Sequence, residues 1–246
     1  MKKLRAAAIA LVLAQLASAS TLYYGGDPDG FSALVSGASW NKPLDPTSQN
    51  ISWLYDDFVV PSGGWTITAL GGNFVTEVPT AYWLEYHIRT GVSEGSPGTL
   101  VAFGYDVPTV TPNGFDFGQQ TGFYVELTFP LTNFDVIELP PGTYWLSLFW
   151  HNYIVVPGAI PYITTTSGAN AVGGPFSNRS YWHAPDFGLE YIDPAPLLGL
   201  ENVDFSYRIS GTLEITATPE PRMWLLIGTS LGLLRASKRK PAQARS

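Results

Sequence analysis

Along most of this chain, large apolar residues recur at every second position. The clearest runs are residues 82–89, 123–129, 144–151 and 203–209, where apolar side chains share one parity and more polar ones mostly take the other. A strand places alternate side chains on opposite faces, whereas a helix would repeat every 3.6 residues. The pattern therefore predicts β-strands with one buried face. Shorter apolar runs predict further strands at 58–60, 65–70, 74–78 and 100–105.

Glycine and proline separate these runs. Turn-forming pairs and triplets stand at 63–64, 71–72, 96–98, 112–114 and 140–142. Eight or more short strands with such turns predict an all-β fold, an antiparallel two-sheet β-sandwich with jelly-roll-like topology. The stretches 21–50 and 156–200 do not alternate, and we expect them to be long connections that carry a site or cover the sheets.

The chain contains no cysteine. It can therefore form neither a disulfide nor a thiolate metal site, and it has no cysteine nucleophile. Packing alone must stabilise the sandwich.

The first nineteen residues have the organisation of a signal peptide. Lys2, Lys3 and Arg5 precede an apolar run at 6–16, and the sequence Ala17-Ser18-Ala19 follows. A basic start, an apolar core and an A-x-A site are typical of a secretory signal. We expect residues 1–19 to be removed by signal peptidase after Ala19, following transfer by the Sec machinery.

The C-terminal residues 218–246 read as a second sorting signal. Pro219, Glu220 and Pro221 precede an uncharged apolar segment, 223–234, and basic residues follow it. As a helix these twelve residues would span about 18 Å, well short of a bilayer core of roughly 30 Å. This length favours a processing signal over a durable anchor, and the basic end predicts a cytoplasmic terminus.

The order of Pro-Glu-Pro, a short apolar segment near Trp224 and a basic tail resembles the PEP-CTERM sorting domain of Gram-negative bacteria. The resemblance implies recognition by an exosortase-type membrane peptidase, transient inner-membrane association, and delivery to the cell surface or extracellular matrix. The strings YDDFVVPSGGWTITAL, HIRTGVSEGSPGTLVA and LPPGTYWLSL also look like a β-sandwich ectodomain that recurs in PEP-CTERM proteins and has no assigned activity.

Removal of both signals would leave a β-sandwich ectodomain at residues 20–217. It retains four basic residues, Lys42, Arg89, Arg179 and Arg208, against nineteen Asp and Glu, a formal charge of −15. So acidic a surface repels nucleic acid and anionic lipid. Cations or neutral polymers are the expected partners, and nucleic acid is not one.

Enzyme motifs lack the context they need. The G-x-S-x-G pattern occurs at 91–95 and 228–232, but a nucleophile elbow requires a strand that leads into a helix. His87, His151 and His183 do not have a metal-ligand spacing, so we expect rim residues, although strands could bring them together. The adjacent Asp56 and Asp57 would point to opposite faces of a strand, which favours a role at a strand start or turn over catalysis. The expectation is that the protein is not an enzyme.

Two acidic residues are a candidate metal site. Asp27 and Asp29 in the sequence GGDPDG resemble the opening of an oxygen-ligand calcium loop. Asp, Pro and Gly are equally the residues of an ordinary turn, which is the favoured interpretation. No cofactor is expected, with Ca²⁺ as the alternative.

Aromatic residues are abundant, at 14% of the chain. Exposed rings can stack on sugars, which makes Trp145, Trp150, Tyr153 and Trp182 candidate ligand-binding residues; the favoured alternative is that these rings fill the core. Two functional hypotheses remain. One is an exported, non-catalytic surface or matrix protein that joins exopolysaccharide or biofilm material. The other is a carbohydrate-active module, binding or hydrolytic, at the cell surface.

Overall fold

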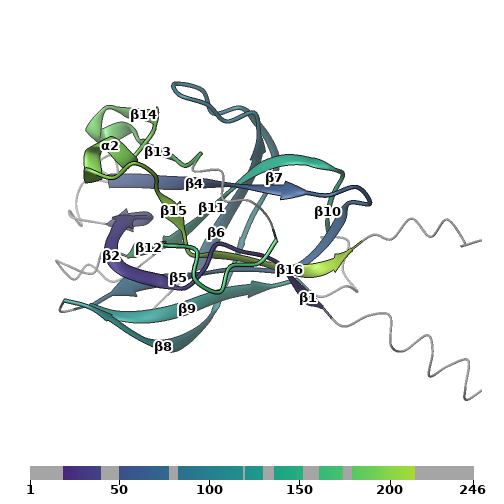
Figure 1. Ribbon diagram of the computed structural model, residues 1–246, viewed down its shortest axis with the longest axis horizontal. Coiled ribbons are helices and arrows are strands. Elements are labelled where there is room, and N and C mark those ends of the chain that lie inside the picture. Colours follow the sequence, from purple (N-terminus) through teal and green to yellow (C-terminus); the bar gives the residue numbers. More distant parts are fainter. Residues whose placement is uncertain are drawn as a thin grey trace, which may run out of the picture. The chain divides into compact units, whose positions relative to one another are not determined.

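The computed structural model describes residues 19–39, 50–77, 83–118, 120–129, 136–151, 161–173 and 179–213 (Figure 1). These residues form an all-β sandwich of two sheets, as the alternating pattern predicts. Within them, no helix has both the length and the apolar character needed to cross a bilayer. The predicted apolar helix at 223–234 and all but Ala19 of the signal peptide lie outside the described residues.

The first sheet is organised around one long strand, β5 (Trp65–Thr76). Its main order is β1 (Ser20–Tyr24), β16 (Tyr207–Leu213), β5, β12 (Tyr162–Thr166) and β15 (Asp204–Phe205). Four further strands extend it, namely β2 (Pro28–Val35) on β12, β9 (Gln120–Thr128) and β10 (Ile137–Leu139) on β5, and β8 (Thr109–Phe117) on β9.

The second sheet contains seven strands. In order they are β14 (Leu189–Ile192), β13 (Tyr181–Ala184), β4 (Asn50–Val60), β3 (Gly37–Ser39), β11 (Gly142–His151), β6 (Trp83–Thr90) and β7 (Thr99–Asp106), and β4 also pairs with β11. All pairs are antiparallel except β3–β11. A 3₁₀ turn, η1 (Pro185–Phe187), and a short helix, α2 (Ala195–Leu198), lie in the connections around β14.

The core lies between the sheets and is built from one parity of each strand. In β6 and β11 the inward residues are Leu84, Tyr86 and Ile88, and Leu146, Leu148 and Trp150. The other parity forms the face of the second sheet that points away from this core, which we call the outer face. The alternation read from the sequence thus separates core from outer face correctly in both strands.

Gly71 and Gly72 do not form the turn that the sequence predicts, because β5 continues straight through them. A Cβ at Gly71 would lie 2.6 Å from the Tyr124 hydroxyl, and one at Gly72 would lie 3.1 Å from the Tyr207 ring. These glycines therefore let neighbouring side chains cover the backbone of the central strand. The predicted strands 65–70 and 74–78 are accordingly one.

The two stretches expected to be long connections contain regular structure. Strands β1, β2 and β3 form within 21–50, and β12, β13, β14 and α2 form within 156–200. Most of these elements have five residues or fewer, too few for a period-two pattern to stand out. The strands among them are defined by pairing: β1 pairs with β16, β3 with β4 and β11, β12 with β5, and β13 with β4, while β2 pairs with β12 and β14 with β13.

Asp56 and Asp57 lie in the middle of β4, not at a strand start. They do face opposite sides, and both are buried. Asp56 points into the core, where its Oδ2 accepts a hydrogen bond of 2.8 Å from the Phe205 backbone N–H. Burial, followed by the charge of Asp204, raises the pKa of Asp56. The carboxyl group thus connects β4 to the opposite sheet.

The first and last described strands are neighbours. Ser20 of β1 pairs with Gly211 of β16, and the two strands run antiparallel. The folded domain therefore begins and ends on the same pair of strands.

Candidate functional site

The three histidines of the chain meet on the outer face. His87 comes from β6, His151 from β11 and His183 from β13. Each has outward parity, and their side chains are 14%, 25% and 17% exposed. Sequence spacing could not place them together, since the three strands are joined by pairings far apart in the chain.

Glu85 joins two of these histidines. Its Oε1 lies 2.8 Å from His87 Nε2, and its Oε2 lies 2.8 Å from His151 Nε2. On the other side of the His87 ring, Nδ1 lies 3.1 Å from the Tyr55 hydroxyl. The hydrogen bonds from His151 and His87 lower the pKa of Glu85 to about 2. The carboxylate is therefore held ionised and in one orientation.

Aromatic rings extend across the whole outer face. In order they are Tyr191, His183, Trp53, Phe149, His151, Trp83 and Tyr105, with successive ring centroids 4.4, 5.4, 5.1, 4.6, 5.5 and 6.2 Å apart. These spacings are those of favourable ring pairs. The row runs from Tyr191 on β14 to Tyr105 on β7 and so connects the two edges of the second sheet.

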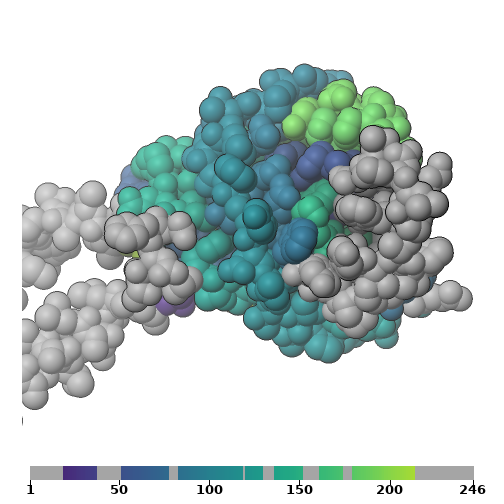
Figure 2. Space-filling view, turned by 180° about the vertical axis from the view of Figure 1, so that it is seen from behind, coloured from purple at the N-terminus to yellow at the C-terminus, as the bar shows by residue number. Residues whose placement is uncertain are grey.

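One end of this row is open to solvent. Tyr191 and Phe149 are buried, but Trp83, Phe103 and Tyr105 on β6 and β7 are 36%, 64% and 69% exposed. Residues of these two strands appear in blue on the face seen from behind (Figure 2). The register places Tyr105 opposite Glu85 and Phe103 opposite His87. We call Trp83, Phe103 and Tyr105, together with the neighbouring Glu85 and His151, the exposed ring patch.

The sequence predicted strands at 82–89 and 100–105, but no site was assigned to this patch. The signal was an aromatic residue at outward positions of two consecutive predicted strands. Parity alone could not show that these strands pair, or that His151 of β11 joins them.

Ser147 lies beside His87 in the sheet, since the two residues are paired across β11 and β6. Its hydroxyl is buried and has no hydrogen-bond partner within the described part of the chain. Both ring nitrogens of His87 already face Tyr55 and Glu85. In this arrangement His87 is not positioned as a base for Ser147.

No group of three or more His, Asp or Glu side chains in the described ranges has a geometry that could hold a metal ion. The predicted Asp27 and Asp29 both make hydrogen bonds within the protein. Asp27 accepts from the Tyr24 hydroxyl at 2.7 Å and from Asn170 at 2.6 Å. Asp29 accepts from the Phe31 N–H and the Thr165 hydroxyl, each at 2.8 Å. Asp29 lies in β2, and the contacts with Thr165 and Asn170 hold this segment against β12 and the residues that follow it.

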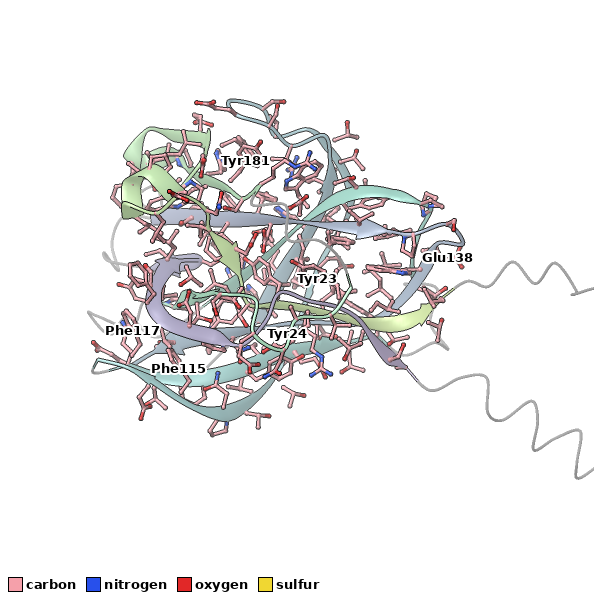
Figure 3. All side chains as sticks on the ribbon, viewed as in Figure 1. Tyr23, Tyr24, Phe115, Phe117, Glu138 and Tyr181 are labelled. Atoms are coloured by element: carbon pink, nitrogen blue, oxygen red, sulfur yellow. The ribbon has the colours of Figure 1, made fainter. Side chains whose placement is uncertain are left out.

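A polar hollow of about 440 Å³ lies beside Asp27. Its lining includes Tyr24 and Phe115, which are labelled on β1 and β8 in Figure 3. Asn73 of β5 connects the wall by accepting from Asn113 at 2.8 Å and donating to Ser206 at 2.8 Å. This network ties β5 and β8 to the stretch between β15 and β16.

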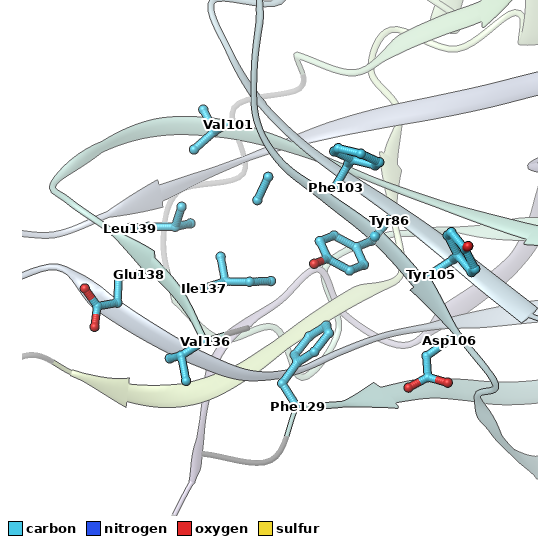
Figure 4. Close-up of a pocket in the computed structure, with 12 residues that line it drawn as sticks. Tyr86, Val101, Phe103, Tyr105, Asp106, Phe129, Val136, Ile137, Glu138 and Leu139 are labelled. Carbon is cyan, nitrogen blue, oxygen red and sulfur yellow. The ribbon is translucent and has the colours of Figure 1, made fainter. Parts of the chain in front are cut away.

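A larger groove of about 650 Å³ opens between the sheets along β7 and β10. Tyr86, Phe129, Ile137 and Leu139 form its apolar wall, and Glu138 and Asp106 also line it (Figure 4). Tyr86 and Phe129 meet edge to face with centroids 5.3 Å apart.

The tryptophans proposed as sugar-stacking residues serve the packing of the domain. Trp150 is fully buried and meets Phe74 edge to face in the core. Trp145 is 6% exposed and donates to the Arg179 carbonyl. Trp182 is half-buried and donates to the Ser52 hydroxyl. Tyr153 lies outside the described residues.

The sorting residues Pro219, Glu220 and Pro221, and Ala17 of the signal site, also lie outside the described residues. Ala19 is exposed and directly precedes β1. No protein-family model matches the chain, and no curated protein matches its sequence.

Proposed function

We propose that this is an exported, non-catalytic protein of the cell surface or extracellular matrix, sorted by an exosortase-type membrane peptidase through Pro219, Glu220 and Pro221. The observation that carries the proposal is the order of that motif, an apolar segment at 223–234 and a basic tail, in a chain that begins with a secretory pattern. Signal peptidase and the Sec machinery are the partners at the other end. The proposal includes a signal peptide at 1–19, a C-terminal apolar helix and jelly-roll topology.

The pairing of β1 with β16 supports this proposal. Because Ser20 lies opposite Gly211, the two processing segments leave the folded domain from adjacent strands. Both could reach one membrane without any opening of the sandwich.

A non-catalytic role is supported by the outer face. Glu85 is engaged with His87 and His151, and Ser147 lacks an activating base. The exposed ring patch favours the binding form of the carbohydrate-active alternative.

Intact mass and cell fractionation test the sorting proposal. We expect the wild-type protein to begin at Ser20, to lack the basic tail and to reach the surface. The variant Pro219→Ala/Glu220→Ala/Pro221→Ala should keep its tail and stay in the inner membrane. The substitution Gln243→Ala, in the tail but outside the motif, is the matched control. A wild-type protein that retains its tail in the membrane would overturn the proposal.

A further inference from the structure

The exposed ring patch combines two features. Large rings on β6 and β7 can be reached from solvent, with Phe103 and Tyr105 more than 60% exposed. Beside them stands a carboxylate fixed by two imidazoles at 2.8 Å. Exposed aromatic residues next to an oriented polar group are characteristic of a binding surface.

The chemistry of the patch selects its ligand. The faces of aromatic rings carry negative charge, so they attract the weakly positive C–H groups on one side of a sugar ring. Each carboxylate oxygen has two acceptor positions, and the histidines occupy one on each. The remaining positions can accept strong hydrogen bonds from hydroxyl groups. A ligand with both apolar faces and many hydroxyls fits this combination.

The negative charge of the patch and of the domain excludes acidic sugars as ligands. Glu85 is ionised, and the predicted ectodomain carries four basic against nineteen acidic residues. An anionic polymer would be repelled by the carboxylate and by the domain as a whole. A purely apolar ligand would leave the carboxylate desolvated, at a large cost in free energy.

We propose that the exposed ring patch binds a neutral polysaccharide, whose sugar rings stack on Trp83, Phe103 and Tyr105 and whose hydroxyl groups donate to Glu85. The inference rests on the proposed surface location, since only there would the protein meet such a polymer. It names the contact surface through which the protein joins the matrix.

Affinity electrophoresis tests the inference. The full-length chain, in a detergent without a sugar headgroup, is run in native gels that contain a β-glucan, an α-glucan, a mannan or a xylan. We expect at least one of these polymers to retard the protein. Alginate, a polyanion, should not retard it. Free migration in all four neutral polymers would overturn the inference.

Variants assign the binding to the patch. Phe103→Ala/Tyr105→Ala should weaken binding about tenfold or more, the effect of losing one or two anchoring rings. Both side chains are highly exposed, so the circular dichroism spectrum should not change. Phe187→Ala removes an equally exposed ring, 62% accessible on η1, and should bind like wild type. Unchanged retardation of the double variant would place any binding elsewhere and refute the inference.

Two further measurements separate the alternatives. Sedimentation velocity tests whether the patch instead binds a second copy of the chain. A dimer that Phe103→Ala/Tyr105→Ala abolishes would overturn polysaccharide binding. The triple alanine variant of the sorting motif should still be retarded in the gel. A wild-type protein that is retarded in the gel but not sorted would count against the proposed export route alone. A wild-type protein that is sorted but not retarded would count against this inference alone.

Discussion

The pairing of Glu85 with two histidines makes the stability of the domain depend on pH. On folding, the pKa of this carboxyl falls from 4.5 to about 2. At about 1.4 kcal/mol per pH unit, the difference stabilises the native state by up to about 3 kcal/mol at neutral pH. Glu85 is 24% exposed, so solvent screening reduces the expected contribution to about 1–3 kcal/mol.

The sign follows from the direction of the shift. A carboxyl with a lowered native pKa stabilises the fold above its unfolded value of 4.5 and loses that effect as the pH falls toward 2. Glu85→Gln should therefore lower the free energy of unfolding by about 1–3 kcal/mol at pH 7, and by less than about half of that at pH 3. Urea unfolding at both values measures the difference. Glu138→Gln, at an exposed position of β10, is the control. If Glu85→Gln lowered the free energy of unfolding by the same amount at pH 7 and at pH 3, the reasoning would be refuted.

Two other substitutions probe contacts of β4 and β5. Asp56→Ala should lower the free energy of unfolding by about 2–4 kcal/mol, because it leaves the buried Phe205 N–H without its acceptor; a loss below about 1 kcal/mol in urea unfolding would contradict this role. Gly71→Ala should lower the melting temperature by several degrees, since its Cβ would lie 2.6 Å from the Tyr124 hydroxyl. In Gly142→Ala the new Cβ would lie no closer than 3.3 Å to its nearest neighbour, the Tyr144 ring, so the melting temperature should fall far less. Equal falls in the two variants would argue against close packing over β5.

The predictable part of this fold is the part with long, evenly alternating strands. The runs at 82–89 and 144–151 correspond to β6 and β11, and their parity separates Trp150 of the core from His151 of the outer face. The same parity already grouped Trp150 with Leu146 and Leu148, so its burial was readable from the sequence. The patch that Trp83 and Tyr105 form could not be predicted from parity, because that prediction requires knowing which strands pair.

The main error in the predicted strand boundaries came from interpreting a glycine pair as a turn. A Gly-Gly pair is equally compatible with a turn and with a strand over which another side chain lies, and only the position of Tyr124 distinguishes the two. At 63–64 the pair does form the turn between β4 and β5, and both residues have positive φ. The site escaped prediction for a related reason, since Glu85, His87 and His151 come together through the register of β6 and β11 rather than through local spacing.

The placement of the last strand determines when the domain can fold. Strand β16 lies between β1 and β5, and Ser20 pairs with Gly211 near the far end of the described chain. The first sheet is therefore incomplete until nearly all of the described chain has been synthesised, and contacts between such distant residues form slowly. A chain that ended before β16 would leave β1 and β5 without the strand that lies between them.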